Sequence, residues 1–459
     1  MIQRGVAGAA ALALTPGLVR ALAPATASGR TRTPLHADRP YLVTAMQAAR
    51  WLERTAQRRG AEISWAADPD RPAEVQYDLY NGTTGVLPFW VELYAATNEP
   101  RALEFVQGSA DHLVRAVEMV DKKDAGLYTG LAGVGFALGL AYRVTRDDAH
   151  REGARRALTL VQDGVRRTED ASKPPRARWA DSTDIISGAA GTGLWLLWAE
   201  RELGAANTLE LARQAGWALM DDAQSVAPGQ LRWKVNATIA REYPNFSHGT
   251  AGVSFFLARL YQATREPAFL EAARAGASYL QAIATTIAND GRMVYHSTPG
   301  NEQIFYMSWC HGPAGTARLF RTLGAITREE SYARYVDQLA AATMAMKVPE
   351  RSPGFWNNVS MCCGNSGVSE FFVARHTMMP DAMALTYAER MAQDTIARAT
   401  SDNDGMRWVQ AENRVSPEAV VAQTGLMQGA AGVGLAMLHL DGAINRRRRA
   451  VVLPDDPFA

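Results

Sequence analysis

The sequence predicts an all-α protein, an α/α barrel or toroid in which seven inner helices are wrapped by outer helices. One motif, GxxG followed by an apolar segment, occurs seven times along the chain. The segments between these copies have the periodicity of amphipathic helices. Each unit has room for two helices and their connections, because the first glycines are 48 to 65 residues apart: Gly82, Gly130, Gly188, Gly249, Gly312, Gly364 and Gly429.

The segment after each GxxG is the expected inner helix. In "LYTGLAGVGFALGLAY" (127–142) and "LMQGAAGVGLAMLHLD" (426–441), apolar or small residues lie nearly all round a helix. A helix of this kind is buried, since a surface helix would have one polar face. Glycines three residues apart permit a tight turn before the helix and a close approach of neighbouring backbones at its start.

The segments between the motifs are the expected outer helices. In "REPAFLEAARAGASYLQAIA" (265–284) and "REESYARYVDQLAAATMAM" (328–346), apolar residues recur at three- and four-residue intervals beside a charged side. An open helical solenoid would also repeat helix pairs. We favour a closed barrel, because an open array does not need small residues at the same end of every unit.

An N-terminal extension, residues 1–39, precedes the repeats. Arg4, an apolar stretch at 6–14 and Ala-Thr-Ala at 25–27 follow the order of an export signal that would end near residue 27. The alternative is a disordered, Ala-rich extension. We expect a cytoplasmic protein unless this segment is a cleaved export signal, and no attached dehydratase domain before the repeats.

The repeats predict a single barrel domain over residues 40–445, followed by a C-terminal tail, 446–459. The run Arg446 to Arg449 lies past the last periodic segment, so we interpret it as the start of a solvated tail. Lys plus Arg (48) nearly equals Asp plus Glu (47), without a basic stripe, which argues against a nucleic-acid partner. No apolar run reaches the length of a transmembrane segment. We expect a monomer.

All three cysteines fall at one end of the predicted barrel. The residue before each first glycine occupies the same place in every unit, and the position before it adds Cys310 and Cys362. Adjacent cysteines rarely form a disulfide with each other, and three are a poor disulfide framework. Free cysteines are often simply buried apolar residues. Three at equivalent positions instead suggest zinc ligands with a fourth position open, as in catalytic sites. The residues before the glycines are Asn81, Thr129, Ser187, His248, His311, Cys363 and Gln428.

The motifs together resemble those of the lanthionine synthetase C-like (LanC-like) family, which contains the lanthipeptide cyclases. They are "SHGTAG" (247–252), "SWCHGPAG" (308–315), "MCCGNSG" (361–367) and the sevenfold GxxG pattern, and the resemblance covers roughly residues 40–441. It implies an α/α barrel with Zn²⁺ at one end. Carried over residue by residue, the ligands are Cys310, Cys362 and Cys363.

The same resemblance implies the catalytic groups. The family's catalytic histidine matches His248, and its catalytic aspartate matches Asp184 in "DIISGAAG", with Asp181 a less well-placed rival. Many family cyclases have an arginine four residues before the cysteine of the WC motif. Here that position is Tyr306.

The family reaction adds a cysteine thiol to a dehydroalanine or dehydrobutyrine of a dehydrated peptide or protein, forming a thioether. We expect His248 to act as general acid, Asp184 to orient its imidazole and His311 to stabilise the developing enolate oxygen. Two alternatives stay open: addition of glutathione or another small thiol, and a zinc-containing scaffold or binding protein without catalysis. Glycoside hydrolases also use helical barrels, but they would leave the cysteine positions unexplained.

Overall fold

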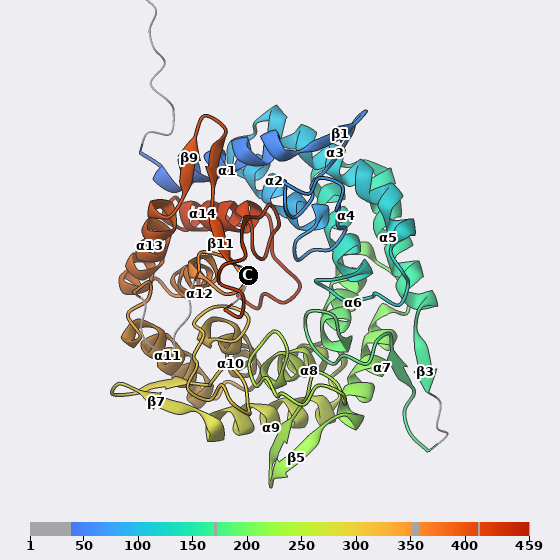
Figure 1. The fold of residues 1–459 in the computed structure, drawn as a ribbon. Coiled ribbons are helices and arrows are strands. Elements are labelled where there is room, and N and C mark those ends of the chain that lie inside the picture. The colour runs from blue at the N-terminus through green and yellow to red at the C-terminus, as the bar shows by residue number, and fades with distance from the viewer. Residues whose placement is uncertain (1–37, 169–171, 351–357, 412–413, 459) are drawn as a thin grey trace, which may run out of the picture.

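The protein is a ring of paired helices around a central axis (Figure 1). The computed structural model describes residues 38–168, 172–350, 358–411 and 414–458. The proposed export signal therefore lies outside the described residues. In the described part, the helices that follow the GxxG motifs form the inner layer: α2 (Thr83–Thr97), α4 (Leu131–Thr145), α6 (Ala189–Leu203), α8 (Thr250–Thr264), α10 (Pro313–Thr327), α12 (Asn365–Met378) and α14 (Ala430–Ile444).

The amphipathic segments form the outer layer, as predicted. Three of them begin with proline in the first turn, where its missing N–H costs no hydrogen bond. Asp147 and Asp381 cap two others by accepting from backbone N–H groups. The outer helices are α1 (Pro40–Thr55), α3 (Pro100–Ala116), α5 (Asp148–Asp163), α7 (Thr208–Asp221), α9 (Pro267–Ile283), α11 (Glu330–Ala345) and α13 (Ala382–Ala397).

Helix pairing closes the ring. Each inner helix packs against the outer helix that follows it, except that α14 packs against α1 from the start of the domain. Each inner helix also contacts the next inner helix, and α14 contacts α2. The prediction of a closed barrel of seven inner helices wrapped by outer ones is thus confirmed, and the open solenoid is excluded.

Backbone hydrogen bonds between the turns also close the barrel. The turn before each inner helix donates an N–H to a carbonyl of the next turn, and the last turn donates to the first. We call these seven turns the ring of turns. The bonds, 2.8–3.1 Å long, run from Tyr80 to Tyr128, Tyr128 to Ile186, Ile185 to Ser247, Ser247 to Cys310, Cys310 to Cys362, Cys362 to Met427 and Met427 to Tyr80.

Close approaches of the backbone, both within a turn and between neighbouring turns, require the glycines of the motif. A Cβ on Gly252 would lie 2.1 Å from the carbonyl oxygen of Phe246 and 2.6 Å from Ile185 in the neighbouring turn. A Cβ on Gly130 would lie 1.8 Å from the carbonyl oxygen of Asp124. No side chain fits at either position without moving backbone, which explains why every unit needs small residues there.

Short antiparallel hairpins and one 3₁₀ helix (Val117–Met119) complete the described secondary structure. Buried tryptophans just after four of the hairpins each donate Nε1–H to a carbonyl near the end of an outer helix, for example Trp65 to Leu52 and Trp233 to Leu219. These bonds satisfy carbonyls that a helix end leaves free. The paired strands are β1 (Gln57–Arg59) with β2 (Glu62–Ser64), β3 (Arg166–Thr168) with β4 (Arg176–Arg178), β5 (Gln224–Ala227) with β6 (Gln230–Arg232), β7 (Thr285–Ile287) with β8 (Gly291–Met293), β9 (Thr400–Asp402) with β10 (Gly405–Arg407), and β11 (Val409–Ala411) with β12 (Val420–Ala422).

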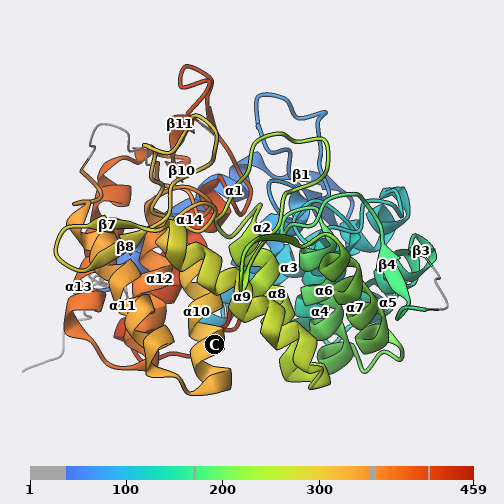
Figure 2. The same ribbon diagram turned by 90° about the horizontal axis from the view of Figure 1, so that it is seen from below.

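The C-terminal segment, residues 446–458, is not a solvated tail. It turns back after α14 toward the middle of the ring, and in Figure 2 it lies on the side away from hairpin β11. Glu92, fully buried in α2, accepts hydrogen bonds from Arg447 and from the backbone N–H groups of Ala450 and Val451. The expectation of a solvated tail is wrong, because this buried carboxylate holds Arg447 and the backbone that follows the arginine run, although Arg446 and Arg448 are exposed.

None of the described helices is long and apolar enough to cross a membrane.

Candidate metal and catalytic site

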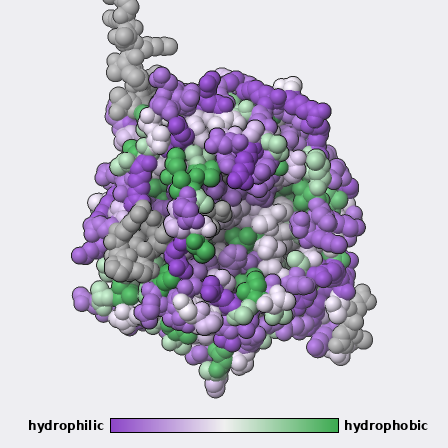
Figure 3. Space-filling view, viewed as in Figure 1, coloured by the Kyte–Doolittle hydropathy of each residue, from purple (hydrophilic) through white to green (hydrophobic). Residues whose placement is uncertain are grey.

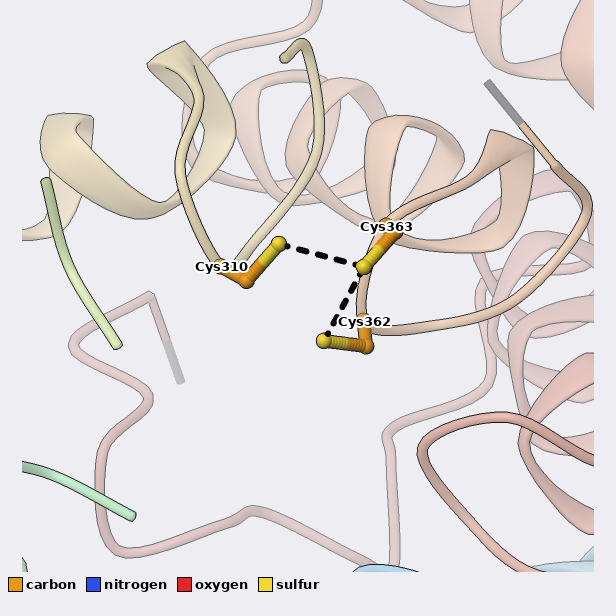
Figure 4. Close-up of side chains that lie close together, drawn as sticks. All are labelled: Cys310, Cys362 and Cys363. Atoms are coloured by element: carbon orange, nitrogen blue, oxygen red, sulfur yellow. Dashed lines mark hydrogen bonds between the residues drawn. The ribbon is translucent and has the colours of Figure 1, made fainter. Parts of the chain in front are cut away.

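Two adjacent turns of the ring bring the three cysteines together. Cys310 lies just before α10, whereas Cys362 and Cys363 lie just before α12, and the N–H of Cys310 donates to the carbonyl of Cys362 at 3.0 Å. The three side chains point toward one another (Figure 4). The Sγ of Cys363 lies 3.3 Å from that of Cys310 and 3.4 Å from that of Cys362. We call this group the thiol cluster.

The thiol cluster fits a zinc ion. All three cysteines are free and buried, and their sulfurs lie within 4.8 Å of one another. Thiolates in a tetrahedral zinc site, with Zn–S of about 2.3 Å, lie about 3.8 Å apart, so the sulfurs need to separate only slightly. Three thiolates from two turns leave the fourth tetrahedral position without a protein ligand from this cluster. This donor set matches a zinc site with one open position.

Tyr80 contacts the thiol cluster from the turn before α2, which is two places along the ring from the turn of Cys362. Its hydroxyl donates to the Sγ of Cys362 at 3.1 Å and accepts from Nε2 of Gln428 at 3.0 Å. Burial raises the pKa of a thiol, but hydrogen bonds from Cys310, Cys363 and Tyr80 hold the pKa of Cys362 well below its usual value. The pKa of Cys310 is raised, because it is buried and donates to its neighbours. Even without a metal, the surroundings therefore favour a thiolate at Cys362.

His248 and Asp184 form a hydrogen-bonded pair at the same end of the barrel. Nδ1 of His248 lies 2.6 Å from Oδ2 of Asp184, and Oδ1 of Asp184 accepts from the N–H of Ser187 at 2.9 Å. The side chain of Asp184 is 1% exposed, whereas that of His248 is 36% exposed. Burial opposes both charges, but their attraction raises the pKa of His248 and lowers that of Asp184. The pair thus holds an imidazolium against a carboxylate with Nε2 left for other partners.

Asp181, the rival carboxylate, lies elsewhere. It is exposed and pairs with Arg166 at 2.9 Å across the β3–β4 hairpin. Of the two predicted candidates, only Asp184 contacts His248.

His311 lies in an aromatic group behind His248. Its ring centroid is 5.7 Å from that of His248, 5.2 Å from that of Tyr243 and 4.4 Å from that of His296. Burial, together with the two neighbouring histidines, holds the pKa of His311 well below its usual value, so its imidazole is neutral. In the described part of the chain its Nδ1 is buried without a hydrogen-bond partner.

One pocket of about 470 Å³ contains the thiol cluster, Tyr80, His248 and His311, whereas Asp184 stands behind His248. That size is typical of small-molecule sites. The face onto which the hairpin β11 projects is hollowed near its centre (Figure 3). The pocket is lined by Gln76, Asp78, Tyr80, Asn81, Thr129, Ile186, Ser247, His248, His296, Tyr306, Cys310, His311, Cys362, Cys363 and Gln428.

Among the lining residues that were not singled out from the sequence, Tyr80 and His296 directly contact the residues of the site. Tyr80 stands two residues before Gly82, the register that also holds Cys310 and Cys362, so counting from the glycines could have found it. His296 lies in the connection between β8 and α10, outside the repeated motif, so the repeat does not predict that it lines the pocket. Its pKa is lowered to about 4 by burial and by the nearby Arg414 and Arg241.

Tyr306, at the family's arginine position, is buried and lines the same pocket. Burial and the neighbouring cysteines raise its pKa, although a hydrogen bond from Arg414 opposes the shift. Arg414 also donates to Asn301 at 3.2 Å. A guanidinium from the segment between β11 and β12 therefore reaches Tyr306.

The match to a family model decides the classification. The model described as "Lanthionine synthetase C-like protein" matches residues 73–451, which is most of the chain. The chain belongs to the lanthionine synthetase C-like family. The matched residues include the thiol cluster, His248 and Asp184.

The chain is also similar to solved structures. Nisin cyclase superimposes on this LanC-like chain with a TM-score of 0.59 at 14% identity, over 88% of this chain and 98% of that one. The GH76A α-1,6-mannanase of a Salegentibacter species gives a TM-score of 0.44 at 12% identity, over 88% and 99%. Cellobiose 2-epimerase from Bacillus thermoamylovorans gives 0.43 at 11%, over 69% and 90%. Because nisin cyclase is 14% identical to this chain, the similarity between the two structures shows a shared fold alone.

Proposed function

We propose that this protein is a zinc-dependent, lanthionine cyclase-like enzyme that adds a cysteine thiol to a dehydroalanine or dehydrobutyrine residue of a peptide. The observation that supports it most is the convergence of three buried thiols in the pocket that also holds His248. Cys310, Cys362 and Cys363 would hold the zinc ion. Bound zinc would lower the pKa of a substrate thiol, so that a thiolate is available near neutral pH.

The charge of the ligand set suits this chemistry. Three thiolates around a bound Zn²⁺ would leave the metal site with a formal charge of −1. A substrate thiolate that binds there would therefore keep most of its electron density on sulfur. A histidine ligand would make the site one charge less negative. We therefore expect the third thiolate to favour nucleophilic attack.

His248 would donate and accept the protons of the reaction. Addition joins the substrate sulfur to the β-carbon, and the electrons of the C=C bond move toward the carbonyl oxygen as an enolate. The α-carbon must then gain a proton. Because Nδ1 of His248 is bonded to Asp184, Nε2 is the atom that would give this proton and regain one from the next thiol. The reaction is thus balanced without release of a proton.

Asp184 and His311 would have supporting roles. The carboxylate of Asp184 fixes the ring of His248 and favours its protonated state. The neutral imidazole of His311 would donate a hydrogen bond to the enolate oxygen, where preorganised donors stabilise developing charge.

The test is thiol consumption by the zinc-loaded protein on a peptide that contains one cysteine and one dehydroalanine. Ring formation leaves the peptide mass unchanged but removes the thiol, so alkylation by N-ethylmaleimide should disappear. His248→Asn should keep its zinc and its fold, with a somewhat lower melting temperature because the pair with Asp184 is lost, and its rate should fall about 10²–10⁴-fold. His376→Asn, on α12 and outside the pocket lining, is the matched control.

Other outcomes would change the proposal. A gain in mass with added glutathione, but no ring, would assign the small-thiol activity. A wild-type protein that holds zinc and leaves every thiol free would support a scaffold instead. Loss of zinc from His248→Asn would make His248 a ligand.

A further inference from the structure

The C-terminal segment contacts the ring of turns from the side away from hairpin β11 (Figure 2). Asp455 is fully buried there, although it follows the last helix and belongs to no repeat. Its backbone carbonyl accepts from Nη1 of Arg318 at 2.7 Å, and the same guanidinium lies 5.9 Å from the ring of Phe458. Arg318 therefore contacts the C-terminal segment at two places, Asp455 and Phe458.

The carboxylate of Asp455 joins two distant units of the barrel. Its Oδ2 accepts from Nε1 of Trp309 at 2.9 Å, and its Oδ1 accepts from the hydroxyl of Tyr128 at 3.2 Å. The rings of Trp309 and Tyr128 are also packed together, with centroids 5.0 Å apart. Both partners belong to turns of the ring, one before α4 and the other before α10.

These partners lead directly to the thiol cluster. Trp309 is the residue before Cys310, and the N–H of Cys310 bonds to Cys362 at 3.0 Å. The indole is buried and also packs on Phe246, with centroids 5.7 Å apart. Because the indole has one polar atom, its bond to Asp455 sets which way the side chain lies. A rotation of Trp309 would move the backbone that carries Cys310.

A carboxylate is a costly choice for this position. An apolar residue would fill the space without desolvating a charge, whereas burial disfavours the ionised form of Asp455. Its two oxygens satisfy the indole and the phenol together, which no apolar residue could do. The arrangement thus suits precise orientation of these rings.

We propose that Asp455 is a positioning residue for the metal site. Its hydrogen bonds to Trp309 and Tyr128 fix the turn that contains Cys310, and hence the spacing of the three sulfurs. The proposal rests on the proposed function, since it assumes that the thiol cluster binds a metal. Groups that orient metal ligands from outside the coordination sphere typically change metal affinity about 10–100-fold when they are removed.

The test compares variants of the full chain by competition with a chromophoric zinc chelator. Asp455→Ala should bind zinc about 10–100-fold more weakly than the wild type. Asp455→Asn should bind nearly as well, because the amide oxygen accepts from Trp309 and the amide NH₂ can donate to Tyr128. Asp456→Asn is the matched control, since its carboxylate pairs with Arg449 and Arg318 and makes no bond to either ring.

A double-mutant cycle and a spectrum separate positioning from mere stabilisation. Trp309→Phe removes the indole donor and should weaken zinc binding, and combining it with Asp455→Ala should add little further loss. In the cobalt-substituted protein, the thiolate-to-cobalt and d–d bands should shift in Asp455→Ala and not in Asp456→Asn. Trp309→Phe provides the same test if Asp455→Ala fails to fold.

The result that overturns the proposal is a lowered melting temperature with unchanged zinc affinity and cobalt bands, since Asp455 would then only stabilise the fold. A wild-type protein that binds neither metal would instead refute the proposed function itself. The two failures are distinguishable because the first requires a wild type that binds zinc.

Discussion

The pair formed by His248 and Asp184 gives the sharpest prediction about chemistry. In Asp184→Asn the amide keeps the size of the side chain but removes its charge 2.6 Å from Nδ1 of His248. Burial would then dominate, and the pKa of His248 would fall. If His248 must be protonated to act, the rate of addition should decline at a lower pH in the variant than in the wild type.

The size of the effect follows from the contact. A hydrogen bond between charged groups contributes about 1.5–3 kcal/mol to stability, and the low end applies because the side chain of His248 is 36% exposed. The raised pKa of His248 stabilises the fold at low pH and stops doing so as pH rises through that pKa. The lowered pKa of Asp184 stabilises it above the carboxylate's usual range. The loss in Asp184→Asn should therefore be largest at weakly acidic to neutral pH.

The assay measures the pH–rate profile of thiol consumption beside urea unfolding at several pH values. Turnover near neutral pH should fall about 10²–10⁴-fold, as expected when a general acid is lost. Asp181→Asn, an exposed carboxylate three residues earlier, should leave both profiles unchanged. An Asp184→Asn variant with wild-type rates across the pH range would refute the assignment of His248 as the acid.

Further predictions concern the ligands, the acceptor of enolate charge and the barrel. Cys363→His should keep zinc but slow addition, because a neutral ligand replaces a thiolate; an unchanged rate would show that ligand charge is not limiting. His311→Asn should lower kcat without moving the pH profile, since His311 is neutral over the working range; a shifted profile would mean that it titrates. Glu92→Gln should lower the free energy of unfolding by about 3 kcal/mol at pH 7, because Arg447 loses its buried partner. Burial opposes the ionised carboxylate, but His439 and Arg447 lower its pKa to about 2, so the difference should shrink as pH falls from about 4.3 toward 2; a difference that grows there would contradict this account.

The architecture could be predicted because its cause is local and repeated. The first glycine of each motif is needed for the tight turn and the second for the approach of the neighbouring turn, so the motif marks the same structural position seven times. Counting from Gly312 and Gly364 was enough to predict that Cys310 and Cys363 meet, and the structure brings their sulfurs to 3.3 Å. The roles of these residues in metal binding and catalysis stay predictions.

The positions of His296 and of the C-terminal segment depend on contacts between distant parts of the chain, which no local sequence pattern encodes. His296 comes from an irregular connection between β8 and α10, so its place beside His311 could not be counted from a glycine. The C-terminal segment was misjudged because an arginine run normally lies in solvent. Its partner Glu92 is 355 residues from Arg447 and has the appearance of an ordinary polar residue in an apolar helix.

The central claim is that Cys310, Cys362 and Cys363 bind a zinc ion that keeps one position open for a substrate thiol. Zinc-edge X-ray absorption of the purified, metal-replete protein tests it most directly. We predict one zinc per chain with three sulfur neighbours at about 2.3 Å and one oxygen or nitrogen, changing to four sulfurs when a thiol peptide is added. A site with fewer than three sulfurs, or metal-replete protein without zinc, would contradict the account.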